Sequence, residues 1–330
     1  MKLEKFYKDK KVLVAGGTGM VGQMLVPKLL SMGSEVYIAS MDNPSLAPKG
    51  IKKFYKLNLI SIENCLKITK NKEIVFNLLG VTGSPKTNYE KPGSFMMSNL
   101  YCAVNLLYAA QINKVDNYLY TSTYGVYGKG KMKEENVWKT FPSPHDKYAG
   151  WAKRIGELQV EAYQKEFKFK SLCVVRPANI YGPHLNFNPK NSMVVASLIK
   201  RIFDNENPLN VWGDGTAVRD FVFSGDVADA ILKVLYKKIK KPINIGSGKG
   251  ISIKNLVNSI LKTRYVKNKI KINFDTSKPT GDKKRVLDMK YANSQGIFCK
   301  KKLVDGLNET IDWYLKNKNL KNKKFNYYEK

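Results

Sequence analysis

Short apolar runs alternate with stretches of helical periodicity along the first three quarters of the chain. An apolar run at 11–15 (KVLVA) precedes a helical pattern at about 23–32, and a second apolar run follows at 35–40 (EVYIAS). This order predicts a β-α-β unit. Further apolar runs predict strands at 74–80, 117–124, 171–181 and 242–248. Helical patterns at 94–111 and 153–167 lie between them. The alternation predicts an α/β fold with a doubly wound parallel sheet.

The pattern changes after residue 181. A loop rich in Asn and Pro covers 181–192, and a helical pattern at 193–204 and a short apolar run at 209–213 follow it. The remaining segments mix helix and strand signals without internal repeats. We therefore expect a second, smaller unit of mixed α/β structure beside the parallel sheet.

The composition argues against several classes of protein. No run of about 20 apolar residues is present and no apolar leader precedes the first predicted strand, so we expect a cytoplasmic protein without membrane contact. The formal net charge is +30, but only six of the 57 basic residues are Arg and the lysines are dispersed along the chain. This dispersal predicts a solvated lysine surface and no nucleic-acid partner.

Cysteine, histidine and arginine are rare in this chain, and their scarcity limits the possible functions. The four cysteines are scattered and only two histidines are present, so neither a disulfide framework nor a metal site is predicted. In a chain where Lys is the default cation, a retained Arg indicates a role that needs a planar, fork-shaped donor, such as clamping a phosphate.

Three glycines with the spacing GxxGxxG join the first strand to the first helix. Gly16, Gly19 and Gly22 allow a tight turn and a close approach of the backbone to a pyrophosphate at the helix N-terminus. Their place inside a β-α-β unit predicts a dinucleotide-binding loop. The second strand ends at Ser40, Asp42 stands two residues later, and no Lys or Arg lies between Ser40 and Pro48. This favours NAD, with NADP as the alternative.

The motifs as a set resemble the extended short-chain dehydrogenase/reductases that act on nucleotide sugars. The segments that carry the resemblance occur in the family's order and include GGTGMVG at 16–22, NLLG at 77–80, TSTYGVYG at 121–128 and RPANIYGP at 176–183. The later segments at 179–202, 211–231 and 274–289 are similar to the GDP-fucose synthase branch of this family. The resemblance covers nearly the whole chain and implies a Rossmann-type sheet and an NAD(P)-dependent enzyme.

The resemblance also implies a domain division and an oligomeric state. Residues 1–180 together with about 215–248 are expected to bind the dinucleotide, and residues 181–214 with 249–330 are expected to bind a GDP-sugar. Members of the family usually form homodimers through two long helices per subunit. Here those helices are 94–111, with a stripe of Met97, Tyr101, Val104 and Tyr108, and the helix that contains Lys153.

The family implies roles for the matching positions. A threonine hydrogen-bonds the C4 oxygen of the sugar, a tyrosine exchanges a proton with that oxygen, and a lysine holds the nicotinamide ribose and lowers the pKa of the tyrosine. The expected catalytic residues are Thr123, Tyr148 and Lys153. The expected cofactor-binding residues are Gly16, Thr18, Gly19, Met20, Val21, Gly22, Ser40, Asp42, Asn58, Leu59, Leu79, Gly80, Asn99, Tyr148, Lys153, Pro177, Asn179 and Ile180. The expected substrate-binding residues are Thr123, Asn179, Val194, Arg201, Trp212, Arg219 and Lys278.

The sequence departs from the family where further proton transfers take place. Epimerisation beside a ketone needs an acid or base on each face, which the GDP-fucose synthases supply with a Cys and a His. Those positions hold Gly125 and Met193 here, and Tyr124 and Gly125 replace the Asp-Glu pair of the related dehydratases. His145 and His184 are candidate substitutes.

We therefore predict an oxidoreductase at C4 of a GDP-linked hexose or heptose that does not epimerise its substrate. It would oxidise a 4-hydroxyl or reduce a 4-keto group in nucleotide-sugar biosynthesis for surface glycans. The alternatives are an epimerase/reductase of the GDP-fucose synthase type and a non-catalytic dinucleotide-binding sensor.

The spacing between the expected tyrosine and lysine is unusual. Tyr148 precedes Lys153 by five residues, whereas the family spacing is four, and on one helix five residues turn the second side chain by about 140° from the first. The segment WAKRIGE (151–157) aligns Lys153 firmly and puts Ala149 at the tyrosine position. We predict that the helix begins after Gly150, with Tyr148 on the preceding loop. Otherwise Tyr148 points elsewhere and Thr123, a water or another group moves the proton.

Overall fold

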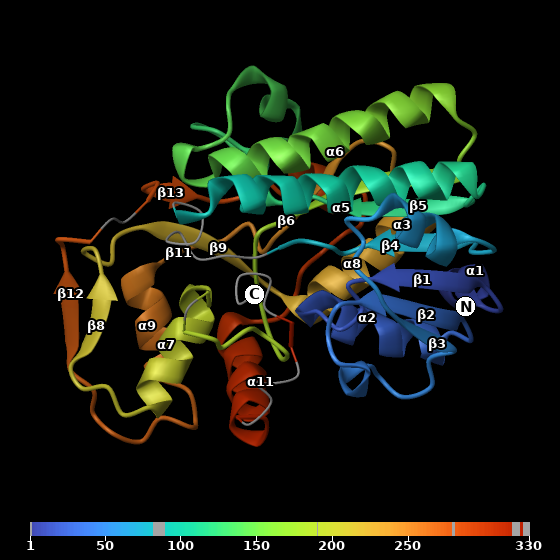
Figure 1. Ribbon diagram of the computed structural model, residues 1–330. Coiled ribbons are helices and arrows are strands. Elements are labelled where there is room, and N and C mark those ends of the chain that lie inside the picture. The colour runs from blue at the N-terminus through green and yellow to red at the C-terminus, as the bar shows by residue number, and fades with distance from the viewer. Residues whose placement is uncertain (1, 82–89, 190, 279–280, 319–323, 326–330) are drawn as a thin grey trace.

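A parallel sheet of seven strands forms the centre of the larger unit of the fold (Figure 1). The structure is a computed structural model that describes residues 2–81, 90–189, 191–278, 281–318 and 324–325. The strands of this sheet are β1 (Lys11–Ala15), β2 (Glu35–Ser40), β3 (Lys53–Lys56), β4 (Ile74–Asn77), β5 (Asn117–Thr121), β6 (Ser171–Pro177) and β10 (Ile243–Ile245). Their order is β10-β6-β5-β4-β1-β2-β3, and every pairing is parallel. The predicted doubly wound fold is confirmed.

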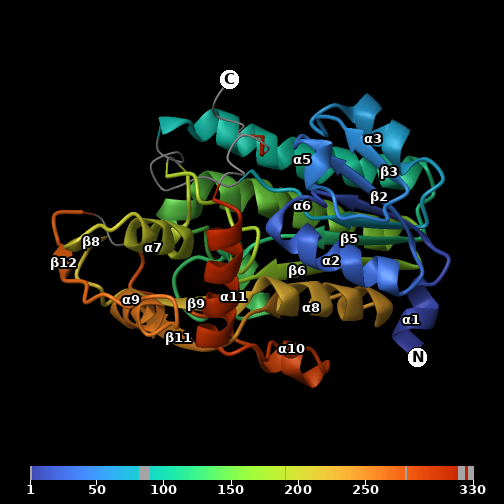
Figure 2. The same ribbon diagram turned by 90° about the horizontal axis from the view of Figure 1, so that it is seen from below.

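Helices cover both faces of this sheet (Figure 2). The helices α2 (Met20–Ser31) and α8 (Ser224–Tyr236) lie on one face, and α3 (Ile62–Thr69), α5 (Pro92–Ile112) and α6 (Lys147–Glu166) lie on the other. Along β1, Val12 and Val14 pack toward α2 and α8, whereas Leu13 and Ala15 pack toward α3 and α5. Because both faces are covered, the central strands are mostly apolar and do not alternate regularly with polar residues.

A smaller unit lies beside one end of the sheet, on the left of Figure 1. Its strands are β7 (Asn179–Tyr181), β8 (Leu209–Trp212), β9 (Val218–Phe223), β11 (Gly250–Ser252), β12 (Ile272–Asp275) and β13 (Lys284–Arg285). Its helices are α7 (Val194–Phe203), α9 (Ile253–Leu261) and α11 (Leu303–Lys316). The short helices α1 (Lys2–Tyr7) and α10 (Lys290–Ser294) flank the larger sheet. The apolar faces of α7, α9 and α11 share one core with β8 and β9.

Several boundaries differ from the sequence prediction. The run predicted as one strand at 171–181 breaks at Ala178, so that β6 belongs to the large sheet and β7 pairs with β9 in the small unit. The chain therefore passes between the two units within this run. The strand β3 was not predicted, because its four residues (KFYK) alternate weakly and sit at the edge of the sheet. None of the helices that the structure describes is long and apolar enough to cross a membrane.

The start of α6 contradicts the prediction. The helix begins at Lys147, three residues before Gly150, so Tyr148 lies in its first turn and not on a preceding loop. Gly150 does not absorb an inserted residue; it allows the helix to approach its neighbours. A Cβ at this position would stand 2.7 Å from the Cβ of Pro142 and 2.8 Å from the carbonyl oxygen of Gly125. The physical reason for the glycine is close packing. Because the helix is continuous from Lys147, the separation of about 140° between Tyr148 and Lys153 applies.

Replacing Gly150 by Ala tests this close approach. The added methyl group is expected to lower the free energy of unfolding by about 1–3 kcal/mol, because neither neighbour lies at the end of a flexible side chain. Gly93→Ala on α5 is the matched control, since nothing lies within 4 Å of a Cβ there. Chemical denaturation measures both. Equal free energies of unfolding for the two variants would contradict the close packing of α6 at Gly150.

Candidate active site

The glycine loop follows β1 and leads into α2. Gly16 has a φ of +83°, which L side chains rarely adopt, and it accepts a hydrogen bond from the amide of Gly19 at 2.9 Å. A Cβ on Gly22 would lie 2.6 Å from the carbonyl oxygen of Gly16, so only glycine lets α2 start this close to the loop. Met20 and Val21 form the first turn of the helix, whose N-cap is Gly19. The N-terminus of α2 is therefore shaped to approach a phosphate.

Three polar side chains meet at the end of β2. The hydroxyl of buried Thr18 donates to the Asp42 carboxylate at 2.7 Å, and it lies 2.7 Å from the Ser40 hydroxyl. These are the positions that the sequence assigns to the adenosine ribose. The chain end also reaches this corner, which sequence reasoning missed: the amide of Phe325 donates to Asp42 at 2.7 Å, and the Lys324 ammonium lies 3.4 Å from the Thr18 carbonyl oxygen.

A buried lysine joins α6 to the ends of two central strands. Lys153 is 7% exposed, and its ammonium donates to the carbonyl of Leu79 at 2.8 Å and of Thr121 at 2.9 Å. It also stands 3.7 Å from the place of a Cβ on Gly80. Because the order of the strands reverses between β4 and β1, the loops after them border the crevice where doubly wound sheets bind ligands.

Burial sets the acidity of this lysine. Desolvation lowers the pKa of Lys153 to about 8, and the nearby Cys102 and Glu157 oppose part of this shift. The group is thus mainly an ammonium at neutral pH. Asn99 of α5 closes the same corner, since its side chain exchanges hydrogen bonds with the backbone of Val81 at 3.1 and 3.2 Å.

The other residues expected around the cofactor lie on the same loops. Asn58 caps the turn before α3 by accepting from the amide of Ile60 at 3.1 Å, and Leu59 is buried beside it. Pro177 ends β6, and Ile180 follows in β7. All these loops follow strands of the parallel sheet, so the predicted set lies along its carboxyl edge.

A short turn after β5 carries the expected threonine. Thr123 is the N-cap of the turn at Tyr124–Val126, and its hydroxyl accepts from the amide of Gly125 at 3.2 Å. The Tyr124 phenol donates to the Asn179 side chain at 2.8 Å, and Asn179 donates in turn to the carbonyl of Asp220 at 2.9 Å. Burial raises the pKa of Tyr124. Asn179 therefore holds the turn against β9.

The structure does not bring Tyr148 to Lys153. Tyr148 is 38% exposed, and its ring lies beside the ammonium of Lys147, which is 5.5 Å from the ring centre. The helix position that shares the face of Lys153 one turn earlier is Ala149, four residues before it. The family's tyrosine position is thus filled by Ala149, which carries no proton.

A group of charged side chains that sequence reasoning missed lies beside the Thr123 turn. Arg285 is almost fully buried, and it pairs with Asp146 at 3.0 Å and with Asp282 at 2.8 Å. It also donates to the carbonyl of Tyr124 at 3.0 Å. Arg219 joins the group by donating to the carbonyl of Asp282 at 2.6 Å. The scarcity of Arg in this chain was the available signal, but it did not identify the acidic partners.

The remaining residues expected around the sugar lie in the smaller unit. Val194 begins α7, and Arg201 near its end pairs with Glu206. Exposed Trp212 ends β8, and Lys278 follows β12, the strand that pairs with β8. Arg201 also donates to the carbonyl of Asn210 within β8, so these four positions lie on or next to the neighbouring elements α7, β8 and β12.

The two histidines differ in their surroundings. His184 packs on Trp313 with ring centres 4.8 Å apart, and burial lowers its pKa to about 4. His145 is exposed next to Asp146. Among the residues that the structure describes, no three His, Cys, Asp or Glu side chains gather as a metal site would require.

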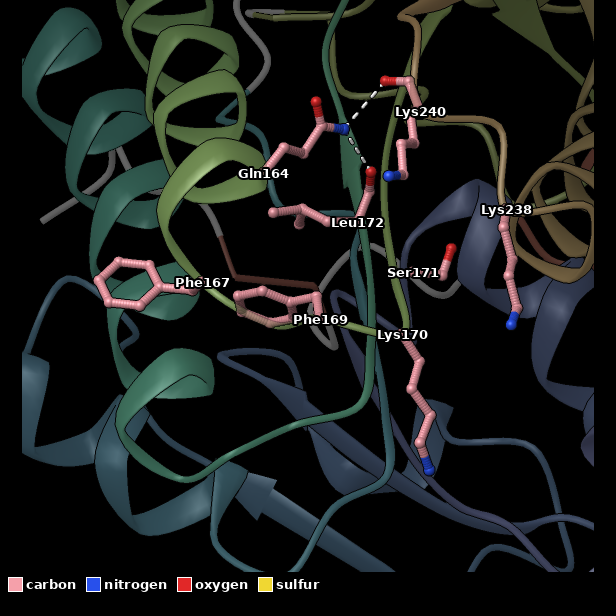
Figure 3. Close-up of a pocket in the computed structure, with 8 residues that line it drawn as sticks. All are labelled: Gln164, Phe167, Phe169, Lys170, Ser171, Leu172, Lys238 and Lys240. Carbon is pink, nitrogen blue, oxygen red and sulfur yellow. Dashed lines mark hydrogen bonds between the residues drawn. The ribbon is translucent and has the colours of Figure 1, made fainter.

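A small cavity lies at the opposite edge of the sheet (Figure 3). It is lined by the start of β6 and the end of α6, where Gln164 donates to the carbonyls of Leu172 at 2.6 Å and Lys240 at 2.9 Å. Its volume of about 30 Å³ suits one water molecule. The cavity is separate from the carboxyl edge that carries the glycine loop and Lys153.

Comparisons with known proteins agree with this geometry. Residues 12–246 match the family described as the NAD dependent epimerase/dehydratase family. GDP-L-fucose synthase 1 of Arabidopsis thaliana is 28% identical over 321 residues, which cover 94% of either chain. GDP-L-fucose synthase of Escherichia coli (strain K12) is 27% identical over 327 residues, which cover 93% of this chain and 97% of that protein. The UDP-glucose 4-epimerase of Thermotoga maritima, solved with UDP-glucose, matches with a TM-score of 0.80 and 25% identity over 93% of this chain and 99% of its own.

Removing the buried ammonium tests the role of Lys153 in dinucleotide binding. Lys153→Met is expected to weaken NAD binding by about tenfold or more at pH 7, because a hydrogen bond from a charged group contributes roughly 1.5–3 kcal/mol. The difference from the unmodified protein should shrink as the pH rises through about 8, where Lys153 loses its charge. Isothermal titration calorimetry on protein freed of dinucleotide measures both effects.

Lys72→Met is the matched control for this substitution. Lys72 is 8% exposed and burial also lowers its pKa, but it lies between Lys70 and Tyr37, away from the carboxyl edge of the sheet. Its loss should leave the affinity for NAD unchanged. An equal loss of affinity in the two variants would show that Lys153 acts only through the stability of the fold.

Proposed function

The chain belongs to the NAD dependent epimerase/dehydratase family, and we propose that it is an NAD(P)-dependent oxidoreductase acting at C4 of a GDP-linked hexose or heptose. The GDP-L-fucose synthases that match nearly its whole length support the GDP-linked substrate. One observation carries the proposal. The lysine of the family motif is present and buried, whereas the two further proton-transfer residues of the epimerases are absent. Lys153 holds the corner between β4 and β5, whereas Gly125 and Met193 stand where the relatives' motif places a Cys and a His.

The roles of the residues follow from their positions. The bound dinucleotide would supply or accept the hydride at the sugar C4. The glycine loop and the N-terminus of α2 would hold its diphosphate, Thr18, Ser40 and Asp42 its adenosine ribose, and Lys153 its nicotinamide ribose. The Thr123 hydroxyl would hold the C4 oxygen of the sugar.

We assign the two ligands to different units. Residues 1–180 with about 215–248 would hold the dinucleotide, and residues 181–214 with 249–330 would hold the GDP-sugar. The strands β7 and β9 depart from this division, because they pair with each other in the smaller unit and not in the large sheet. Ser40 and Asp42 favour NAD, although Lys324 provides a cation at this corner that would suit the extra phosphate of NADP. We also propose that the enzyme acts in the cytoplasm and supplies nucleotide sugars for surface glycans.

Isotope incorporation tests the reaction directly. The protein is incubated in heavy water with a GDP-4-keto-6-deoxyhexose and reduced NAD or NADP. We expect loss of the absorbance of the reduced nicotinamide and a 4-hydroxyl product without deuterium at C3 or C5, because Gly and Met exchange no protons with carbon. A sample without enzyme corrects for spontaneous exchange.

Each other outcome has a definite meaning. Enzyme-dependent deuterium at C3 or C5 would establish the epimerase/reductase alternative. If the protein binds the dinucleotide but neither reduces any GDP-4-keto sugar nor oxidises any GDP-hexose or GDP-heptose, the sensor alternative replaces the proposal.

We further propose that the enzyme is a homodimer formed through α5 and α6, which lie side by side on one face of the molecule (Figure 1). Both helices carry large, exposed apolar or aromatic side chains, namely Met97, Tyr101, Tyr108, Ile112, Ile155 and Leu158. Val104 of the predicted stripe packs instead against the core beneath α5. An exposed apolar surface of this extent is typical of a protein interface.

A charged substitution on this surface is expected to separate the subunits. Leu158→Glu should give a monomer in light scattering where the unmodified protein gives a dimer, because a carboxylate would be buried without a partner at the contact. Phe298→Glu is the control, since Phe298 is similarly exposed but lies outside both helices. A monomeric mass for the unmodified protein would remove the proposal.

A further inference from the structure

A carboxylate lies directly before α6, three residues before the position of the family's tyrosine. Asp146 is the N-cap residue directly before the first turn of α6, whereas Ala149 and Lys153 lie four residues apart on one face of the helix. Ala149 cannot exchange a proton, and the Tyr148 ring lies beside Lys147 on another side of the helix. The titratable group that lies at the start of α6 beside the turn at Gly125 is Asp146.

The carboxylate of Asp146 does not perform the usual task of its position. An Asp at a helix N-cap normally accepts hydrogen bonds from the first turn of the helix. Asp146 is the N-cap of α6, yet it makes no side-chain capping bond. It pairs with Arg285 at 3.0 Å instead. Its geometry is thus better explained by what it faces across the site than by the start of the helix.

What Asp146 faces is the turn that carries Thr123. The Cγ of Asp146 lies 3.4 Å from the point where a Cβ of Gly125 would stand, and the Cγ2 of Thr123 lies 3.3 Å from that same point. The absence of a side chain at Gly125 leaves open the space between the Asp146 carboxyl group and the Thr123 methyl group. Its side chain is 29% exposed, so it borders solvent-accessible space and is not sealed in the core.

We propose that Asp146 is the proton-transfer residue of this enzyme, exchanging a proton with the C4 oxygen of the sugar that Thr123 holds. This inference rests on the proposed function at C4. In the reducing direction the C4 carbon gains a hydride from the reduced dinucleotide, the C=O electron pair moves to oxygen, and that oxygen takes the proton of the Asp146 carboxyl group. The carboxylate then regains a proton from solvent. In the oxidising direction the Asp146 carboxylate accepts the hydroxyl proton as the hydride leaves C4.

The surroundings of Asp146 suit both halves of this exchange. Burial raises the pKa of Asp146, and the adjacent Arg285 lowers it again. The other charged or titratable groups that face it are Asp282, His145, Arg219 and Tyr124. A carboxyl group with a raised pKa keeps its proton to higher pH than a free one does, which an acid at the sugar oxygen requires.

Other donors near Thr123 are less suitable. The Tyr124 phenol already donates to Asn179, and burial raises its pKa, which disfavours loss of the proton. The Thr123 hydroxyl accepts from the Gly125 amide, and an unactivated alcohol is too weak an acid to supply the proton alone. Of the side chains described around this turn, Asp146 combines proximity, partial exposure and a suitable acidity.

Two substitutions separate a chemical role from a structural one. Asp146→Asn is expected to lower kcat for C4 reduction roughly 100-fold or more, with KM and dinucleotide affinity changed less than about threefold. Asp282→Asn is the matched control, because it breaks an equivalent ion pair with Arg285, at 2.8 Å and with similar exposure. It should lower kcat less than about tenfold. Melting temperatures should fall to a similar extent in both variants.

The pH profile supplies a second readout that a structural role would not move. In the reducing direction Asp146 must be protonated, so kcat of the unmodified enzyme should fall as the pH rises through the pKa of this group. The residual activity of Asp146→Asn should lack this dependence, and Asp146→Glu should restore it in part. Tyr148→Phe should retain most of the activity.

The possible failures are distinct. If the unmodified protein turns over a GDP-sugar but Asp146→Asn and Asp282→Asn lose equal activity, or Tyr148→Phe alone abolishes it, the assignment of Asp146 is wrong and the proposed function stands. If the unmodified protein turns over none of the GDP-4-keto sugars, GDP-hexoses and GDP-heptoses, the proposed function is wrong and the assignment of Asp146 is wrong with it.

Discussion

The candidate site depends on one buried ammonium group. Lys153 projects from α6 into the carboxyl edge of the sheet and donates to backbone carbonyls after β4 and at the end of β5. Removing a charge from water is costly, and here the cost is offset by two charge-assisted hydrogen bonds in a place of low dielectric. The same bonds fix the position of α6 relative to the two strand ends. Tyr148 lies on the same helix, five residues before this anchor.

The first turn of α6 shows how close packing decides chemistry. Because Gly150 lets the helix contact the turn at Gly125, the helix runs without interruption from Lys147 to Lys153. An uninterrupted helix cannot bring side chains five residues apart onto one face. It leaves Asp146 at the N-cap of α6, where Arg285, which also pairs with Asp282, binds its carboxylate beside the turn that carries Thr123. The positions of Tyr148 and Asp146 thus both follow from the start of α6 at Lys147.

The prediction of the fold succeeded where a pattern has a local physical basis. The apolar runs at 11–15 and 35–40 form β1 and β2 because strands buried on both faces need apolar residues throughout. The family resemblance and the dependence on a nicotinamide dinucleotide are likewise confirmed. The start of α6 was wrong because glycine was interpreted by its backbone freedom, whereas this glycine serves a close contact with a residue far away in the sequence. The roles of the individual site residues stay predictions.

The sequence by itself determined the alternation of strands and helices, the dinucleotide loop and the family, since each of these depends on residues close together along the chain. Only the tertiary structure decided which acid stands beside Thr123. Asp146 and Arg285 come from segments 139 positions apart, and their ion pair forms only when the start of α6 and β13 come together in the folded chain. The order of residues sets periodicity and turns, but the distance between a carboxylate and a threonine 23 positions apart depends on how α6 packs against β5.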